Sequence, residues 1–533
     1  MRSLRNPIVV ATLIALSWSV ARVVIAHRTG IPVPQIHDEF SYLLGADTFA
    51  KGRLANPPHP IAEFFDSPHV LVRPVYASKY PPGQALVLAL GEKVFGSPFW
   101  GVVIENALLI FTVALAVSVW VSTMWGAGVA VILALYLLPP NYWADSYWGG
   151  ALTAAGGTLV VLAIVFHRDR RLLASGLAFG SGAAILFFTR PYEGGAFTLA
   201  IIGVYFVRNG WRFVLIPALA AAPILLAALA WTGYYNRAVT GDPFLLPYIL
   251  HDRQYNVAPP FWILPRRPEP VYSHPRLAAQ HGLGGWEDSA YSRHRPWWNG
   301  LARGVTLSLL FTASQVSGFL GLLVFAVPVA WRDWRFRQLS AVLLFFIAAL
   351  SIESFNLPHY AAPALGAVAI LTGVWLERLW TMDRHAITAG KAVGVAFFGF
   401  AIAGMNGAEF LATPLRADRQ QLIQRLSTLN APQLVLVRYP TPSWNIDVEW
   451  VYNSADIDSQ HVIFAHDLGP ERDENLLRYY PGRQAWIASV DDSGYRLDPY
   501  PSAATDATAA RAAMIASAGS VPSRILISSG GRK

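Results

Sequence analysis

The chain has 533 residues, of which 54% are hydrophobic and only 14% are charged, a composition outside the range of ordinary soluble domains. Its formal charge of +8 does not indicate a nucleic-acid partner, because the basic residues are concentrated in short loops between apolar runs, where they set membrane topology. Cysteine is absent, which excludes disulfides, thiolate metal sites and a cysteine nucleophile. We therefore expect a polytopic membrane protein that does not bind nucleic acid.

Apolar runs long enough to cross roughly 30 Å of hydrocarbon recur along the chain and predict about eleven spans. They are residues 8–26, 99–121, 124–138, 150–166, 172–189, 195–207, 213–231, 305–330, 339–354, 361–379 and 386–410. The first run lacks a clear cleavage site and should remain as an anchor. With a cytoplasmic N-terminus, as Arg2 and Arg5 indicate, nearly every short basic loop lies in the cytoplasm. The expected location is a bacterial inner membrane.

This topology places all substantial mass outside the membrane on the periplasmic side. It includes a first periplasmic loop over 27–98 and a long one over 233–304. Within the first loop, apolar residues at helical spacing predict a short amphipathic helix over 38–51 that lies along the membrane interface. A proline pair then precedes a second interfacial helix over 84–94.

The composition changes to that of a soluble domain near residue 413. Residues 433–437, 461–464 and 485–490 are predicted strands, and 471–480 is a predicted helix. We expect a transmembrane domain over 1–412, a small periplasmic α/β domain over 413–500, and a disordered or weakly helical tail over 501–533. The predicted fold class is mainly α, a polytopic transmembrane helical bundle with this α/β domain at its C-terminus.

Ionisable residues gather at the outer ends of the predicted spans, where burial is costly and function is therefore indicated. Asp38 and Glu39 follow the first span, Asp145 follows the third, and all three are candidate catalytic residues. Neighbouring carboxylates such as Asp38 and Glu39 can hold a divalent cation, Mg or Mn, or one of them can act as a general base. The structural alternative is a helix cap at Asp38 with Glu39 in the first turn, and a turn residue at Asp145.

Cationic and hydrogen-bonding side chains at the same depth are suited to a phosphate. The candidate donor and phosphate ligands are Arg22, Lys79, Arg190, His359 and Tyr360. Further residues expected in the same cleft are His37, Tyr42, Glu105, Glu193 and Glu353. Lys79 could equally be a solvated loop lysine, and Arg190 could be a snorkelling arginine paired with a nearby glutamate.

The order of these features resembles the GT-C superfamily of integral-membrane glycosyltransferases, in the branch related to protein O-mannosyltransferases and the aminoarabinose transferase of lipid A. The matching features are HDEFSY at 37–42 after the first span, KYPPG at 79–83 before the second, Asp145 after the third, and an outer soluble domain. The resemblance covers roughly residues 8–379. The insertion of Tyr80 departs from the lysine-proline-proline pattern of that family.

The resemblance implies that a sugar, hexosyl or pentosyl, moves from a polyprenyl-phosphate donor to a lipid, glycan or protein acceptor on the outer face. It also implies that Asp38 or Glu39 is the base or a metal ligand, and that Asp145 is a second acidic residue of the site. A polytopic transporter or lipid flippase is the main alternative, although such proteins place ionisable residues at the midplane. A non-catalytic envelope assembly protein is another, but it leaves the acidic pair without a role.

Overall fold

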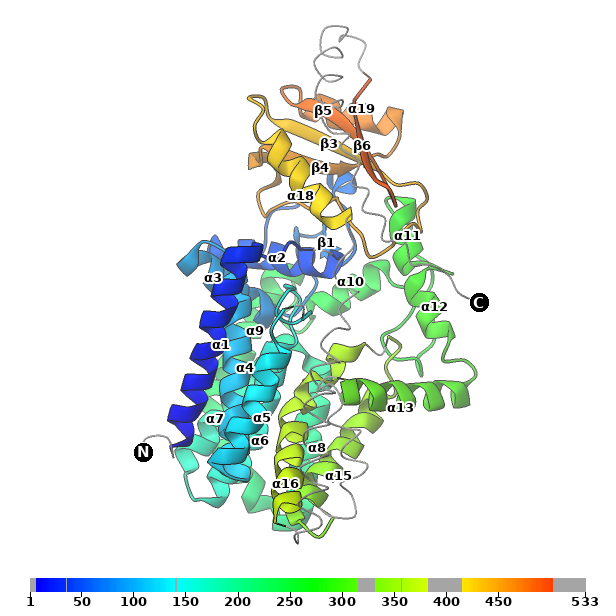
Figure 1. The fold of residues 1–533 in the computed structure, drawn as a ribbon. Coiled ribbons are helices and arrows are strands. Elements are labelled where there is room, and N and C mark those ends of the chain that lie inside the picture. Colours follow the sequence, from blue (N-terminus) through cyan, green and yellow to red (C-terminus); the bar gives the residue numbers. More distant parts are fainter. Residues whose placement is uncertain are drawn as a thin grey trace, which may run out of the picture.

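A computed structural model describes residues 6–34, 36–139, 141–314, 331–355, 357–381 and 415–501. A bundle of long helices forms one part of the molecule and a small sheet domain lies beyond one end of it (Figure 1). The predicted span 386–410, the segment 315–330 of another span, and the tail 502–533 lie outside the described residues.

The helices of the bundle follow the predicted spans closely. They are α1 (Pro7–Thr29), α4 (Phe99–Trp120), α5 (Thr123–Tyr136), α6 (Ala151–Arg168), α7 (Leu172–Thr189), α8 (Pro191–Asn209), α9 (Trp211–Thr240), α15 (Trp334–Leu350) and α16 (Leu365–Trp380). Within the described part of the chain, six helices are long and apolar enough to cross a membrane. The mainly α fold of a multi-pass membrane protein is thus confirmed.

Small residues allow the central helices to approach closely. A Cβ on Gly157 of α6 would lie 2.0 Å from the carbonyl oxygen of Pro363, in the short helix η3 (Pro358–Ala364) that precedes α16. Close backbone packing at glycine is a common basis of helix association in membranes. The central helices α4 and α6 are largely buried, whereas α1 and α9 expose most of their apolar side chains, as expected for helices that face lipid.

Basic loops meet at the end of the bundle away from the sheet domain (Figure 1). The guanidinium groups of Arg168 and Arg208 lie 3.9 and 5.5 Å from the ring centre of Trp334. Nearby, Arg335 donates a 2.7 Å hydrogen bond to the carbonyl of Trp120. The loops after α4, α6 and α8 and the start of α15 therefore share one side, which agrees with the alternation of spans predicted from the sequence.

Two helices, α2 (His37–Ala50) and α3 (Pro82–Phe95), lie across the other end of the bundle (Figure 1). The predicted helices over 38–51 and 84–94 match them to within two residues. Between them the chain forms the short helix η2 (Ala62–Phe64) and a two-stranded antiparallel sheet of β1 (Val70–Leu71) and β2 (Ala77–Ser78).

The long segment after α9 contains helices that the sequence analysis did not predict. They are α10 (Pro247–Tyr255), α11 (Pro275–His281) and α12 (Trp286–Ser292). The next helix, α13 (Trp297–Ser314), overlaps the predicted span 305–330 but begins eight residues before it. The first three have only seven to nine residues, too few for an apolar period to emerge. Helix α9 itself continues to Thr240, nine residues beyond the predicted end at 231.

The C-terminal domain is a four-stranded sheet in the order β4-β3-β5-β6. Its elements are α18 (Leu415–Leu426), β3 (Gln433–Arg438), β4 (Val462–His466), α19 (Pro470–Tyr479), β5 (Gln484–Asp491) and β6 (Gly494–Pro499). β3 pairs in parallel with β4 and β5, and β6 is antiparallel to β5. The predicted strands and α19 are confirmed, whereas α18 and β6 were not predicted.

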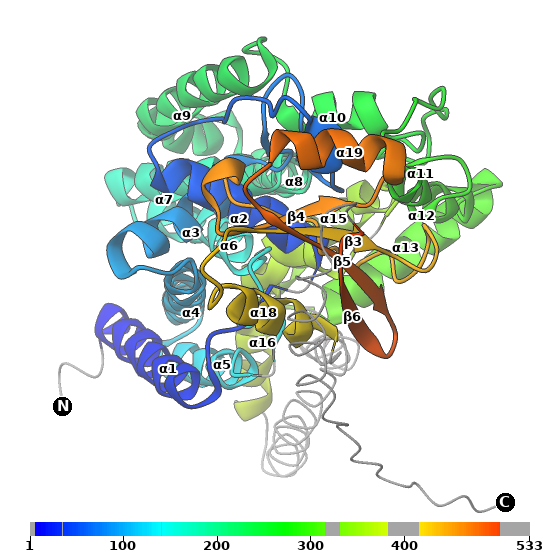
Figure 2. The same ribbon diagram turned by 90° about the horizontal axis from the view of Figure 1, so that it is seen from above.

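The two faces of this sheet have different partners. Helices α18 and α19 lie on opposite sides of it (Figure 2). Val435 and Val437 face α18, while Leu434 and Leu436 pack with α19 and with Phe64 of the first loop. Because side chains alternate along a strand, one face of β3 joins the domain to the rest of the protein.

Candidate active site

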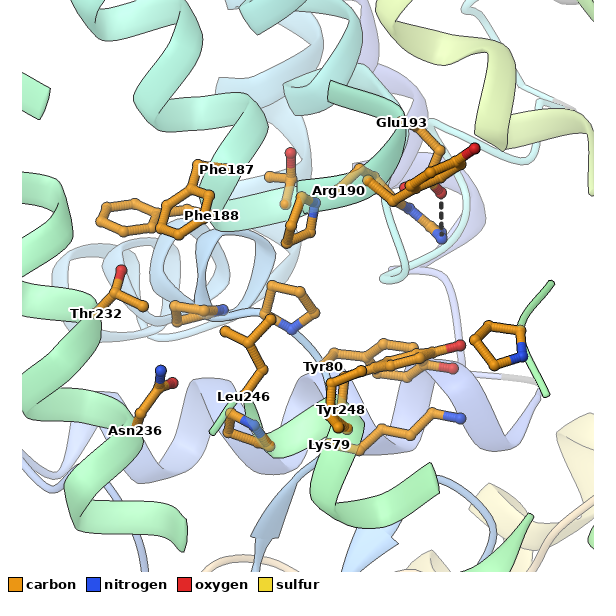
Figure 3. Close-up of a pocket in the computed structure, with 18 of the residues that line it drawn as sticks. Lys79, Tyr80, Phe187, Phe188, Arg190, Glu193, Thr232, Asn236, Leu246 and Tyr248 are labelled. Carbon is orange, nitrogen blue, oxygen red and sulfur yellow. Dashed lines mark hydrogen bonds and ion pairs between the residues drawn. The ribbon is translucent and has the colours of Figure 1, made fainter. Parts of the chain in front are cut away.

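Two adjoining cavities lie at the end of the bundle that faces the sheet domain. The first has a volume of about 180 Å³ and a mostly apolar wall (Figure 3), and we call it the apolar cavity. Its wall includes Phe187, Phe188, Pro81, Pro82, Leu246 and Phe261. The second has a volume of about 310 Å³, and we call it the polar cavity. Its wall includes His37, Asp38, His69, Glu287, His359 and Asp447.

The cavities meet at a junction that carries two cations. Lys79, Tyr80, Arg190, Tyr248 and Tyr360 belong to the walls of both cavities. In Figure 3, Lys79 and Arg190 extend toward the same end of the apolar cavity. An anionic group at this junction could therefore be bound by both cations while an apolar chain attached to it lies in the apolar cavity.

Aromatic rings hold these cations in place. The ammonium of Lys79 lies 5.2 Å from the ring centre of Tyr80 and 5.1 Å from that of Tyr248. The guanidinium of Arg190 lies 4.9 Å from the ring centre of Tyr360 and donates to the carboxylate of Glu193 at 3.4 Å. Burial lowers the pKa of the Lys79 ammonium, and the carboxylates around the polar cavity act in the opposite direction. A phosphate bound here would neutralise the positive charges of both side chains.

Asp38 lies in the first turn of α2 and points into the polar cavity. Its carboxylate is 3.0 Å from His37 Nδ1, accepts a hydrogen bond from the hydroxyl of Tyr80, and lies 3.8 Å from His69 Nε2. Burial by itself would raise the pKa of Asp38, but His37 and Tyr80 hold it well below its ordinary value. Asp38 is therefore an ionised carboxylate next to the cationic junction.

Glu39, the other half of the acidic pair, is directed elsewhere. Its two carboxylate oxygens accept 3.0 Å hydrogen bonds from the backbone N–H groups of Ile36 and Tyr147. The first of these closes a capping interaction at the start of α2, with Ile36 as the N-cap residue. The helix-cap alternative thus applies to Glu39, whereas Asp38 does not cap the helix. The structure places only one carboxylate of the predicted pair in the cavity.

Three further candidates lie outside both cavity walls. Arg22 donates to the carboxylate of Asp145 at 2.7 Å and to the carbonyl of Ala144 at 3.0 Å. The other oxygen of Asp145 accepts from the backbone N–H of Asn141. Glu105 is fully buried and accepts a 3.1 Å hydrogen bond from Gln84. Each of these groups is paired with other residues and belongs to neither cavity wall, so the structure does not bring them to Asp38 as the sequence predicted.

The remaining candidates do converge. His359 lies in the wall of the polar cavity with its ring centre 4.8 Å from that of Trp148. Tyr42 lies in the wall of the apolar cavity, where its ring stacks on Tyr80 at 4.3 Å. Glu193 and Glu353 are also in the wall of the apolar cavity.

Several residues that line the cavities were not identified in the sequence analysis. His69, Tyr248 and Glu287 come from outer segments without an apolar period, and nothing near them in the sequence distinguished them. Asp447 comes from the C-terminal domain, 409 positions after Asp38 in the numbering, and its carboxylate lies 3.9 Å from His37. The C-terminal domain therefore closes part of the polar cavity.

No protein-family model and no curated protein matches the chain. Among solved structures, an oligosaccharyltransferase of Archaeoglobus fulgidus in complex with Zn and sulfate matches with a TM-score of 0.50 and 12% identity, over 91% of this chain and 68% of that one. ArnT of Cupriavidus metallidurans, bound to undecaprenyl phosphate, matches with a TM-score of 0.46 and 15% identity, over 89% and 93% of the two chains. The match to the oligosaccharyltransferase shows a shared fold, in agreement with the fold that the sequence resemblance implies.

Replacement of Glu39 by glutamine should lower stability. A glutamine has one carbonyl oxygen, so either the Ile36 or the Tyr147 N–H loses its acceptor and faces an amide donor. An unsatisfied buried N–H costs about 1–3 kcal/mol. We expect a lower melting temperature for Glu39→Gln in detergent and little change for Glu63→Gln, which is only half-buried. An unchanged melting temperature for Glu39→Gln would contradict the capping role.

Proposed function

We propose that the protein is a membrane glycosyltransferase that moves a sugar from a polyprenyl-phosphate donor to an acceptor hydroxyl. The observation that carries this proposal is the junction at which an apolar cavity ends at Lys79 and Arg190 and a polar cavity with Asp38 begins. The polyprenyl chain lies in the apolar cavity, its phosphate at the two cations, and its sugar in the polar cavity. The shared fold with an oligosaccharyltransferase supports this assignment.

Transfer takes place at the anomeric carbon of the donor sugar. The acceptor oxygen forms a bond to this carbon as the bond from the carbon to the phosphate oxygen breaks. The acceptor proton passes to the Asp38 carboxylate, and the bonding electrons leave with the polyprenyl phosphate. Lys79 and Arg190 stabilise the negative charge that develops on this leaving group. Attack opposite to the leaving group inverts the anomeric configuration.

The side chains around Asp38 could also bind the expected divalent cation. Asp38, His37 and His69 each offer one ligand atom, and these atoms lie within 4.8 Å of one another. One carboxylate and two imidazoles fit Mn or Zn better than Mg, which prefers oxygen ligands. The His37 and Tyr80 contacts of Asp38 are compatible with a base that needs no metal, and the mechanism above routes no step through one.

The basic loops at the far end of the bundle support a sidedness in which the N-terminus is cytoplasmic and both cavities open toward the periplasm of a bacterial inner membrane. A lipid-linked donor could then enter from the outer leaflet between helices. The acceptor, which is a lipid, glycan or protein hydroxyl, approaches through the polar cavity beneath the C-terminal domain.

The proposal is tested with the purified protein in nanodiscs and a polyprenyl-phosphate donor that carries a labelled sugar. Envelope lipids, glycans and proteins from a strain that lacks the gene provide acceptors. Transfer of the label to one acceptor class, together with the loss of that sugar from the deletion strain by mass spectrometry, is the expected result. Counterflow of a lipid or solute across proteoliposomes without any glycosylated product would favour the transporter alternative.

Removal of the Lys79 charge should weaken donor binding. A hydrogen bond to a charged group contributes about 1.5–3 kcal/mol, so Lys79→Met should reduce the affinity for polyprenyl phosphate on the order of 10- to 100-fold. Native mass spectrometry or a fluorescence titration with the lipid measures this change. Lys93→Met removes an exposed lysine from α3 and serves as the matched control. Equal affinities of the two variants would remove Lys79 from the phosphate site.

A further inference from the structure

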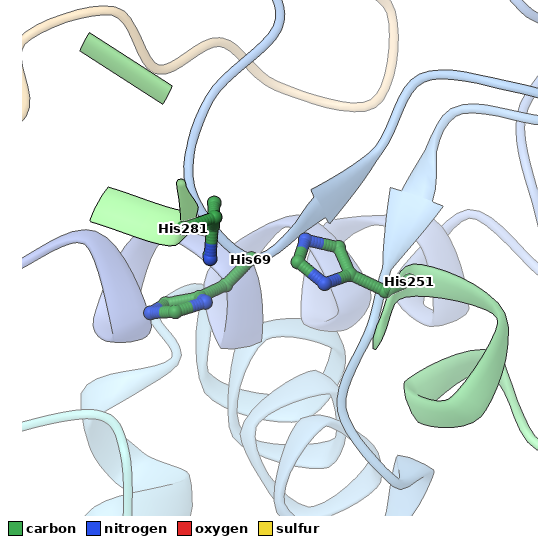
Figure 4. A group of neighbouring side chains, drawn as sticks. All are labelled: His69, His251 and His281. Carbon is green, nitrogen blue, oxygen red and sulfur yellow. The ribbon is translucent and has the colours of Figure 1, made fainter. Parts of the chain in front are cut away.

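Three histidines from separate outer segments converge beside the polar cavity (Figure 4). His69 precedes β1, His251 lies in α10, and His281 is the last residue of α11. One ring nitrogen of each lies within 4.8 Å of those of the other two. We propose that these three histidines form a binding site for Zn²⁺ or a similar transition metal, separate from the Asp38 carboxylate.

The histidines are buried without the hydrogen bonds that buried imidazoles normally make. His69, His251 and His281 are 5%, 1% and 0% exposed. Neither ring nitrogen of His251 has a hydrogen-bond partner among the residues that the structure describes, and the same is true of Nδ1 of His69. A buried polar atom without a partner is costly and requires an explanation, and a bound metal ion provides one.

A carboxylate stands behind one of the ligands. Oε2 of Glu287 lies 3.0 Å from Nδ1 of His281, which leaves Nε2 of this ring available to a metal. A metal-bound histidine commonly donates its other N–H to a carboxylate in this way, which fixes the ring and its tautomer. The ammonium of Lys79 opposes a cation here, and the carboxylates of Glu287 and Asp252 offset it.

The three imidazole nitrogens determine which class of metal this site can bind. Imidazole nitrogens suit Zn²⁺, Cu²⁺ or Ni²⁺, whereas Mg²⁺ and Ca²⁺ prefer oxygen. In a tetrahedral zinc site the ligand nitrogens lie ~3.3 Å apart, so modest ring rotations bring three nitrogens within 4.8 Å into coordination. Three protein ligands leave a fourth position for water, which can arrive from the polar cavity because His69 lies in its wall.

This site shares His69 with the group His37, Asp38 and His69, whose ligand atoms also lie within 4.8 Å of one another, but its other two ligands are different. Asp38 already has His37 and Tyr80 as partners. His251 and His281 do not belong to the group that contains Asp38. A metal at the three histidines would tie the first outer loop to α10 and α11, and so hold the long outer segment over the polar cavity.

The test uses the full chain purified without a polyhistidine tag, stripped with a chelator and reloaded with Zn²⁺ or Co²⁺. We expect about one Zn²⁺ per chain, and X-ray absorption with three imidazole nitrogens at about 2.0–2.1 Å. His251→Ala and His281→Ala should each lose the metal. Glu287→Gln should weaken binding roughly 10- to 100-fold, as for other carboxylates behind metal ligands.

Two further variants distinguish a metal at the three histidines from a metal at the group that contains Asp38. His27→Ala, which removes an exposed histidine at the end of α1, and Asp38→Asn should both retain the metal. Loss of the metal in Asp38→Asn with retention in His251→Ala would place the ion at the other group and overturn the proposal. An absorption spectrum of the wild-type protein that shows oxygen ligands alone, or no bound metal, would overturn it without any variant. None of these measurements depends on glycosyl transfer.

Discussion

Replacement of Asp38 by asparagine is expected to reduce sugar transfer by at least 10²-fold while the protein remains folded. Asparagine preserves the size of the side chain and can still accept the hydrogen bond from Tyr80, but it cannot take the proton of the acceptor. General-base catalysis by one side chain contributes roughly 10²- to 10⁴-fold. The measurement is the initial rate of transfer from a labelled polyprenyl-phosphate donor at saturating donor concentration.

Two comparisons make this result specific. Binding of polyprenyl phosphate to Asp38→Asn should match that of the wild type, because the phosphate site is formed by Lys79 and Arg190. Asp242→Asn, an exposed carboxylate in the loop after α9, should transfer sugar at the wild-type rate. If folded Asp38→Asn transferred sugar at nearly the wild-type rate, the base would have to be another group.

The same assay separates Asp38 from its neighbour. Glu39→Gln is expected to lower stability first, and any loss of transfer should follow the loss of folded protein. The two carboxylates stand side by side in the sequence and could not be distinguished there. The structure distinguishes them by direction, because successive residues of a helix project about 100° apart and only Asp38 faces the cavity.

The parts of the fold that could be predicted are those in which apolar residues form a long run or recur regularly. The spans and the helix α2 came from runs of apolar residues, and β3 and β5 came from buried strand patterns. Helices α10 and α11 could not be predicted, because seven to nine residues held by contacts with other segments carry little pattern of their own. The histidines on them, His251 and His281, could not be identified from the sequence for the same reason.

Site residues could be predicted only where a charged side chain lies at the outer end of a membrane span. Arg190 and Lys79 were identified because cations at the outer ends of spans are unusual, and both lie at the junction. Arg22 and Asp145 satisfied the same criterion, yet they pair with each other at 2.7 Å and belong to neither cavity wall. Depth along a helix is readable from sequence, but the direction in which a side chain points around the bundle is set by packing.

A buried arginine connects α11 to the C-terminal domain. Arg276 of α11 is 3% exposed, donates to the carbonyls of Trp444 and Asn445 at 2.9 and 3.2 Å, and lies 3.3 Å from the carboxylate of Glu449. These contacts fix the loop that carries Asp447 into the wall of the polar cavity. Arg276→Met should therefore release this loop.

Removal of one member of a buried ion pair costs about 3–5 kcal/mol, because the other charge is left uncompensated. For Arg276→Met we expect amide hydrogen exchange over residues 442–449 to accelerate roughly 10²- to 5 × 10³-fold, since exchange reports the free energy of local opening. Arg438→Met removes a guanidinium that is 56% exposed and paired with Asp467, and should change exchange little. Equal protection in both variants would show that the domain is held over the cavity by the apolar face of β3 and not by Arg276.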